Sequence, residues 1–262
     1  MKRIGLYYLV IATFAVLAAF TSCKKEKENA NTVKLLETVI DEGYIDSPLI
    51  FDRLKFEYDE QYRITKISEY NYDGSVYNTK TFTYAGDDLV QVLHSFNSGG
   101  VEMYEYTKNG NTITQIFTYN GDGTIPNYTT TSTIELDSDG FPIKREVIGS
   151  TSVETFEYQN GNLTGKTAIS TSLEYDYTDK SIYVYQYDDK NGALYHCKTP
   201  KWYLFLHLND YGVKNNLTDN LRIYRTVYMY EYDREEFPAK RIRKYHGQMY
   251  ESETGEAFTY IR

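Results

Sequence analysis

A triplet made of a large apolar residue, a polar residue and a second large apolar residue recurs along the chain and constrains its fold more than any other feature. Its copies stand 19 to 30 residues apart, with one longer gap of 55. The copies are Phe56-Glu57-Tyr58, Phe82-Thr83-Tyr84, Tyr104-Glu105-Tyr106, Ile134-Glu135-Leu136, Phe156-Glu157-Tyr158, Tyr175-Asp176-Tyr177, Tyr230-Glu231-Tyr232 and Phe258-Thr259-Tyr260. A period of two turns both large side chains to one face, so each triplet predicts a half-buried β-strand.

Turn residues follow the triplets and link them into hairpins. Asn-Gly and Asp-Gly pairs supply the positive φ angles of tight hairpins, and a second apolar pair follows each of them. Successive hairpins predict an all-β domain over residues 33–262, an antiparallel meander of repeated hairpins that curls into a soluble barrel or half-barrel. The residues leave open whether this sheet closes.

One segment interrupts the repeat between Cys197 and Asn220. Its residues 201–208 are almost all large and apolar, which is typical of a buried helix. We expect one short helical insertion near 200–209 that plugs an open end of the sheet, with an extra strand as the alternative. Thr199 would cap this helix and Pro200 would be its first residue.

The first 32 residues have the pattern of an export signal. Lys2 and Arg3 precede an apolar run from Ile4 to Phe20, which is short for a membrane span. Phe20-Thr21-Ser22-Cys23 resembles the lipobox of bacterial lipoproteins, in the relaxed Bacteroidota form. The resemblance implies a signal peptide at 1–22 and a lipidated Cys23. The polar residues 23–32 that follow predict a flexible tether.

The repeat itself resembles the YD-type repeats of cell-surface proteins. More closely, it is similar to a Bacteroidota lipoprotein family of unknown function whose domain is porin-like in shape. The nearest local match is Tyr185-Gln186-Tyr187-Asp188-Asp189-Lys190-Asn191-Gly192, continued by Thr199-Pro200-Lys201-Trp202 and Asn215-Asn216. The family has Asn-Pro where this chain has Asn191-Gly192. The resemblance covers residues 33–262 and implies a fold, but no catalytic residues.

Charge and patterning exclude several classes of function. A net charge of −9 argues against a surface that follows nucleic-acid phosphates, so we expect no nucleic-acid partner. Glu, Lys, Thr and Asp occupy the strand faces opposite the aromatic rows. A membrane barrel needs an apolar band there, so the pattern favours a soluble barrel despite the porin-like resemblance.

The search for reactive groups yields few candidates. The four histidines lack metal-ligand spacing, so no metal and no cofactor is predicted. With Cys23 lipidated, Cys197 would be an unpaired buried thiol rather than a nucleophile, and no catalytic residue stands out. Aromatic rings stack on sugars. On that ground Trp202, Tyr203 and Tyr187 are ligand-binding candidates, although filling one side of a curled sheet explains most of the tyrosines.

Together these features predict a lipoprotein of the outer membrane, held there by its N-terminal lipid. We expect a non-enzymatic binding or scaffold module whose partner is a glycan or an envelope protein. A hydrolase acting on polysaccharide through two carboxylates in the sheet cavity is the alternative, so the residues favour a non-enzymatic role without deciding it. Lys24 after Cys23 favours outer-membrane delivery and leaves the choice of leaflet, periplasmic or surface-facing, open.

Overall fold

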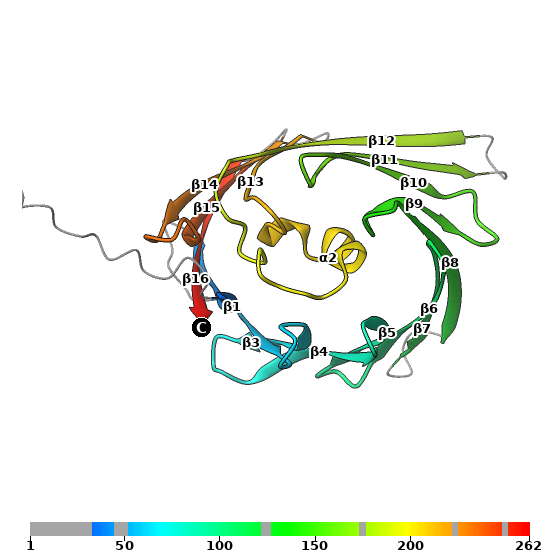
Figure 1. Ribbon diagram of the computed structural model, residues 1–262, viewed down its shortest axis with the longest axis horizontal. Coiled ribbons are helices and arrows are strands. Elements are labelled where there is room, and N and C mark those ends of the chain that lie inside the picture. Colours follow the sequence, from blue (N-terminus) through cyan, green and yellow to red (C-terminus); the bar gives the residue numbers. More distant parts are fainter. Residues whose placement is uncertain (1–32, 45–51, 122–126, 173–176, 222–224, 248–250) are drawn as a thin grey trace, which may run out of the picture. The chain divides into compact units, whose positions relative to one another are not determined.

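The strands of this protein form one closed antiparallel barrel in a computed structural model that describes residues 33–44, 52–121, 127–172, 177–221, 225–247 and 251–262. Each strand pairs with its neighbours in sequence, and β1 pairs with β16 to close the barrel (Figure 1). The strands are β1 (Leu35–Tyr44), β2 (Asp52–Tyr58), β3 (Ile64–Asn71), β4 (Val76–Ala85), β5 (Asp88–Phe96), β6 (Val101–Asn109), β7 (Thr112–Asn120), β8 (Tyr128–Leu136), β9 (Pro142–Val147), β10 (Val153–Gln159), β11 (Asn162–Ser172), β12 (Tyr177–Tyr187), β13 (Leu217–Leu221), β14 (Arg225–Tyr232), β15 (Pro238–His246) and β16 (Glu251–Ile261). The predicted all-β meander is confirmed, and its sheet closes.

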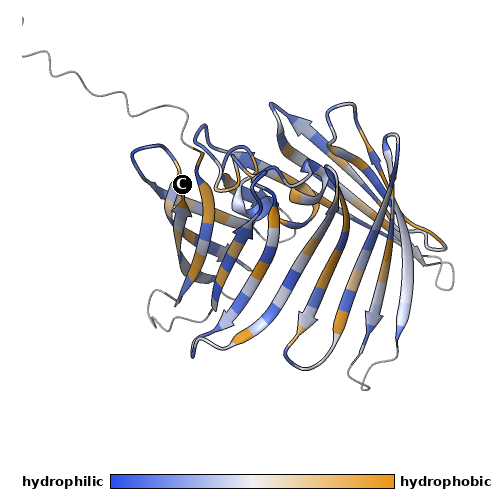
Figure 2. Cartoon of the chain, turned by 60° about the horizontal axis from the view of Figure 1, so that its bottom comes forward, coloured by the Kyte–Doolittle hydropathy of each residue, from blue (hydrophilic) through white to orange (hydrophobic). Residues whose placement is uncertain are grey.

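The strand register turns the large residues of the triplets toward the barrel interior. Phe56 of β2 pairs with Ile67 of β3, and both are buried. Glu57 pairs with Lys66, and both of these side chains face outward. Figure 2 shows the resulting alternation of hydrophobic and hydrophilic residues along the strands. Period-two patterning therefore predicted the facing of these strands correctly.

A β-bulge inside the triplet is a feature that the sequence pattern did not predict. In five of the hairpins the register shifts by one residue between the middle and the last triplet residue, as between Glu57 and Tyr58 or between Glu157 and Tyr158. A bulge bends and twists its strand more strongly. Repetition of this bend around the sheet is consistent with closure into a barrel.

Tyrosine hydroxyls at the last triplet position fasten three of the hairpins. Tyr58, Tyr84 and Tyr260 each donate a hydrogen bond of 2.8 to 2.9 Å to a backbone carbonyl 20 or 22 residues earlier. A phenylalanine would bury the same ring but leave that carbonyl without this donor. The tyrosines thus tie one hairpin to the hairpin before it.

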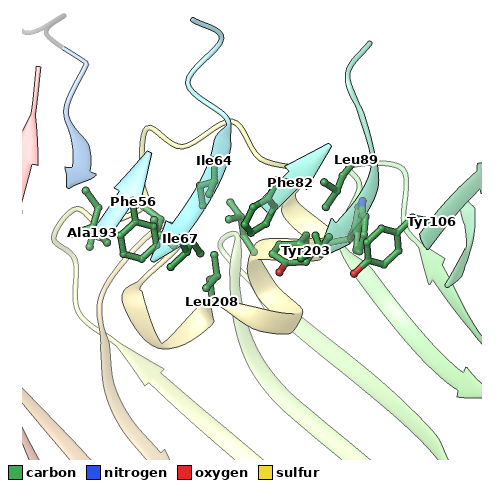
Figure 3. Packing of buried hydrophobic residues seen from close by; sticks show 14 of the residues in the cluster. Phe56, Ile64, Ile67, Phe82, Leu89, Tyr106, Ala193, Tyr203 and Leu208 are labelled. Atoms are coloured by element: carbon green, nitrogen blue, oxygen red, sulfur yellow. The ribbon is translucent and has the colours of Figure 1, made fainter. Parts of the chain in front are cut away.

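A plug fills one end of the barrel. The chain between β12 and β13 enters the barrel and forms the helix α2 (Lys201–His207) and the 3-10 turn η1 (Asn209–Tyr211), which Figure 1 shows inside the ring of strands. Tyr203 and Leu208 pack there in one cluster with inward residues such as Phe56 and Phe82 (Figure 3). The predicted helical insertion near 200–209, plugging an end of the sheet, is confirmed.

The start of the helix differs from the prediction. Helix α2 begins at Lys201, its N-cap is Pro200, and no side chain caps it. The hydroxyl of Thr199 instead accepts a hydrogen bond of 2.9 Å from the backbone N–H of Ile64 and lies 3.1 Å from the hydroxyl of Tyr84. Because this oxygen already serves a buried group on β3, it does not cap the helix.

Polar contacts fasten the plug to the barrel wall. The fully enclosed Arg241 of β15 pairs with Glu256 of β16 and donates to the carbonyl of Asp210 in η1. On the other side, Tyr187 of β12 and Asn209 of η1 bond through their side chains. The plug is therefore held from several strands rather than resting on apolar contacts alone.

Several predictions fall on residues outside the described part of the chain. They are the signal peptide at 1–22, the tether at 23–32 and the triplet residues Tyr175 and Asp176. Within the described part, no helix is long and apolar enough to cross a membrane.

Candidate functional site

The two ends of the barrel differ, and this difference locates the candidate site. The turns that follow the triplets lie at the plugged end, where Lys198 donates from its backbone N–H to the carbonyl of Tyr62. The inward face beyond the plug carries charged and aromatic side chains on the remaining length of the strands. We call the inner surface that runs from the plug toward the opposite end the lumen.

Two cavities lie at the lumen floor, on either side of His207 at the end of α2. One, of about 190 Å³, is lined by Arg145, Lys166 and Phe205 among others. The second, of about 250 Å³, is lined by Lys80, His94 and Tyr211 among others. A further cavity shares Arg145 and Glu154 with the first and extends along β9 to β12. The space is therefore contiguous around Arg145.

Arg145 of β9 is a charged group of the lumen with few partners of its own. Its guanidinium makes no hydrogen bond within the described residues, and its Nε is buried without a partner. The nearest carboxylate oxygen belongs to Glu154, 3.5 Å from Nη1. A guanidinium carries five N–H donors, and a buried donor left unpaired is costly. This group is consequently free to bind an acceptor from outside the protein.

The carboxylates of the lumen have partners of their own. Glu154 lies 2.5 Å from the ammonium of Lys166, and Glu102 lies 3.0 Å from the ring of His94. Glu69 accepts a hydrogen bond of 2.9 Å from the amide of Asn78. By contrast, the half-buried Lys80 of β4 makes no ion pair within the described residues. Lys80 is thus a charged group of the lumen without an ion pair, and Arg145 is a charged group whose Nε lacks a hydrogen-bond partner.

His207 is surrounded by these groups while its side chain stays open to the lumen. Enclosure by the barrel wall, followed by the positive charges of Arg145 and Lys80, lowers the pKa of His207 to about 3. Because the His207 side chain is exposed to the lumen, we attribute the lowered pKa mainly to the charges of Arg145 and Lys80. Its ring stacks on Tyr203, with centroids 4.5 Å apart. Near neutral pH the imidazole is therefore uncharged, and the fixed cations are Arg145 and Lys80.

An aromatic track climbs the lumen wall from this floor. The ring centroids of Tyr104 and Phe117 are 4.8 Å apart, and those of Phe117 and Tyr128 are 5.7 Å apart. Tyr119 extends the row, 5.5 Å from Tyr128. At the lower end, Tyr104 lies 6.4 Å from His207. These four rings lie on β6, β7 and β8, and Tyr128 at the far end is 49% exposed.

The residues predicted from sequence to bind a ligand lie elsewhere. Trp202 and Tyr203 are 5% and 3% exposed and pack against Tyr106 of the wall. Trp202 borders a cavity on the side of the plug that faces away from the lumen, as Tyr187 borders another. Their roles stay predictions, because their contacts in this structure are with the protein itself. Cys23, the predicted lipidation site, lies outside the described residues.

Other chemistry finds little support in the described residues. They contain no group of three or more His, Cys, Asp or Glu arranged to hold a metal ion. Burial raises the pKa of the Cys197 thiol, which disfavours the nucleophilic thiolate. The carboxyls with a resolved pKa shift are Asp59, Asp73 and Asp233; each has a lowered pKa and each lies in a turn rather than in the lumen. Arg145 and Lys80 were not singled out by the sequence pattern, because they carry no motif.

Comparisons with known proteins give a likeness of shape only. No family model matches the chain. No curated protein matches it either. Similar solved structures include a porin-like protein from Bacteroides uniformis, at 13% identity and a TM-score of 0.46, covering 87% of this chain and 97% of that one. Another is a porin-like protein from Bacteroides vulgatus, at 13% identity and a TM-score of 0.38, covering 87% of this chain and 99% of that one. Similarity at this level says nothing about activity, and the closed barrel is evident from the chain's own strand pairing.

Proposed function

We propose that this chain is a non-enzymatic, lipid-anchored binding protein of the outer membrane whose barrel serves as a blind-ended cup. The plug that occupies one end of the barrel is the observation that carries this proposal. A passage for solutes needs a path through both ends, whereas a cup needs one closed end and one mouth. Inward aromatic and charged groups between the plug and the mouth would hold the bound molecule.

Anchoring of the plug supports a fixed floor rather than a gate. Arg241 is buried, and its partners include Glu256, the carbonyl of Asp210 and the rings of Tyr211 and Tyr228. Releasing the plug would remove the bond of the guanidinium to the Asp210 carbonyl and its contact with the Tyr211 ring, and hydrogen bonds from charged donors are the stronger kind. Thr199 and Asn209 add bonds to β3 and β12. The plug is therefore expected to stay in place while ligands come and go.

The outward face supports attachment through lipid rather than through the barrel wall. Outward charged pairs include Lys66 with Glu57, Lys144 with Glu146, and Lys244 with Glu253. Such pairs at mid-wall would be costly in hydrocarbon. Single apolar residues are exposed between them, as Ile116 is, which is normal for surfaces in water. A lipid on Cys23 would then supply the membrane attachment.

The point where the chain enters the barrel adds an orientation to this proposal. Lys34, just before β1, binds Asp233 and Glu235 in the turn before β15, at the plugged end. The chain thus joins the barrel at the plugged end, and the mouth lies at the opposite end. The leaflet, periplasmic or surface-facing, is decided by protease shaving of intact cells.

Fractionation tests the anchoring. Cys23→Ala should move the protein from the membrane fraction to the soluble fraction, because no other lipid attachment is proposed. The control is Cys197→Ala, which removes the other cysteine and should leave the protein in the membrane fraction. A Cys23→Ala protein that stays membrane-bound would show that the lipid anchor is wrong.

A binding screen tests the role of the cup. The full chain, purified in detergent and immobilised, is incubated with glycans and with envelope extracts, and retained molecules are identified. Retention that is lost on competition with free protein supports a binding module. Hydrolysis of any retained glycan, abolished by one acid-to-amide change such as Glu102→Gln or Glu154→Gln, would replace the proposal by the polysaccharide hydrolase.

A further inference from the structure

The lumen floor combines two features that rarely have a purely structural explanation. The first is Arg145, whose guanidinium has no hydrogen bond within the described residues although its Nε is buried. The second is the half-buried Lys80, which makes no ion pair there. Each of them lines a cavity that also contains His207. Unsatisfied buried polar groups in a native structure call for an explanation such as a ligand.

We propose that the lumen binds an acidic saccharide, with Arg145 and Lys80 holding its carboxylate at the floor and the aromatic track of Tyr104, Phe117, Tyr119 and Tyr128 stacking on its sugar rings. This inference rests on the proposed function, a binding cup, and adds the class of ligand and the residues that contact it.

The carboxylate is inferred from the donors that remain free. Guanidinium and ammonium groups donate hydrogen bonds and accept none, and a planar carboxylate matches the fork of a guanidinium with two parallel bonds. Glu154, Glu102 and Glu69 already engage Lys166, His94 and Asn78. Glu154 also lies 3.5 Å from Nη1 of Arg145, but no carboxylate of the described residues fills the donor site at Nε.

The saccharide is inferred from the track. Its rings follow one another at 4.8 to 5.7 Å between centroids along the inner faces of β6, β7 and β8. Tyr104 at its lower end lies 6.4 Å from the ring of His207, which shares a cavity with Arg145. A ligand with several flat-faced rings and one terminal acid would contact both features at once. An isolated small anion would contact the floor alone.

Calorimetric titration of the full chain in detergent tests the inference with defined probes. The acidic probes are oligogalacturonate and hyaluronan tetrasaccharides, and the neutral probes are galacto- and cello-tetraoses. We expect an acidic probe to bind at least about tenfold more tightly than the neutral ones, because charge-assisted hydrogen bonds are the stronger kind. Neutral probes that bind as tightly as the acidic ones would overturn the carboxylate assignment.

Matched variants locate the contact. Arg145→Met should weaken binding of the acidic probe about 10- to 100-fold, and Lys80→Met should weaken it in the same direction. Lys144→Gln is the control, because Lys144 directly precedes Arg145 but points outward to Glu146. This variant should change the affinity by less than about twofold. If Arg145→Met fails to fold, Lys80→Met still tests the inference. Lys80 makes no ion pair within the described residues, so its removal leaves no carboxylate without a partner.

The track has its own pair of variants. Phe117→Ala should weaken acidic and neutral probes alike, whereas Ile116→Ala, on the outer face, should weaken neither. Unchanged affinity in Arg145→Met and Lys80→Met would overturn the inference. Failure of every acidic probe to bind would overturn it too. A ligand recovered in the envelope screen would in that case still support the proposed function of a binding cup.

Discussion

Strand β8 contrasts the two ends of the barrel within a single strand. Tyr128 at its open end and Ile134 near its plugged end both point inward, yet Tyr128 is 49% exposed and Ile134 is 0% exposed. Six residues of strand separate them, about 20 Å. The inward face is therefore buried only where the plug reaches it. Facing follows from the alternation of residues, but burial follows from the position along the barrel axis.

The largest expected effect comes from the plugged end. Phe156 of β10 is 7% exposed and packs with Leu163 of β11 and with Phe205 of the plug. Phe156→Ala should lower the free energy of unfolding by about 3 to 5 kcal/mol, because it opens a cavity in a packed core. Tyr106→Ala, at another inward triplet position that is 5% exposed, should do the same. Chemical denaturation monitored by circular dichroism measures both.

Two controls sharpen the comparison. Glu157→Ala, one residue from Phe156 but outward, should change stability by no more than about 0.5 kcal/mol. Tyr128→Ala, inward but at the open end, should also stay near that value, because little area becomes exposed. A loss at Tyr128 as large as the loss at Phe156 would mean that the open end is packed, and the distinction between the two ends would fail.

The fold was predictable from sequence to the extent that it depends on local chemistry. The Asn160-Gly161 turn illustrates this, since its φ angles of 52° and 76° are the positive values that this residue pair predicts. Closure of the sheet was not predictable, because pairing of β1 with β16 joins the two ends of the domain. The bulges inside the triplets were not predicted either. Each bulge comes just before the last triplet residue, and the alternation of apolar and polar residues that precedes it is the same with or without a bulge.

A smaller effect is expected from the bond between Thr199 and β3. Thr199→Val keeps the shape of the side chain but leaves the buried N–H of Ile64 without its acceptor. The cost should be about 1 to 3 kcal/mol, as for other buried donors left unpaired. Thr83→Val, on the exposed outer face of β4, is the matched control and should cost no more than about 0.5 kcal/mol. Equal losses in the two variants would show that the plug does not depend on this bond.

The candidate site was less predictable than the fold. Trp202 and Tyr203 drew attention as large aromatics in an unusual segment, and they lie in the core of the plug. Arg145 and Lys80 come from β9 and β4, 65 residues apart in sequence. Only the closed barrel places each of them in a cavity shared with His207. Sequence alternation could have marked both as inward, but it could not place them at the height of the plug.

The smallest expected effect comes from His207, where the two regions meet. Enclosure and the charges of Arg145 and Lys80 hold the pKa of His207 in the folded protein below the ordinary value of 6.5. Below about pH 6.5 the unfolded chain therefore binds this proton more readily than the folded chain, so stability falls as the pH decreases through that range. Lowering the pH from 7.5 to 5.0 should therefore reduce the melting temperature of the native protein slightly more than that of His207→Gln.

We expect this difference to be about 1 °C, small because water reaches the ring. Arg145→Met provides the matched background, since removing that charge should let His207 take up its proton more easily in the folded state. In this background the advantage of His207→Gln at pH 5.0 should shrink. An equal pH response in all of these proteins would mean that Arg145 and His207 do not interact, and the cationic floor would lose one of its supports. A smaller advantage of His207→Gln in the Arg145→Met background would show that His207, at the edge of the packed end, interacts with Arg145, the residue proposed to bind ligand in the open end.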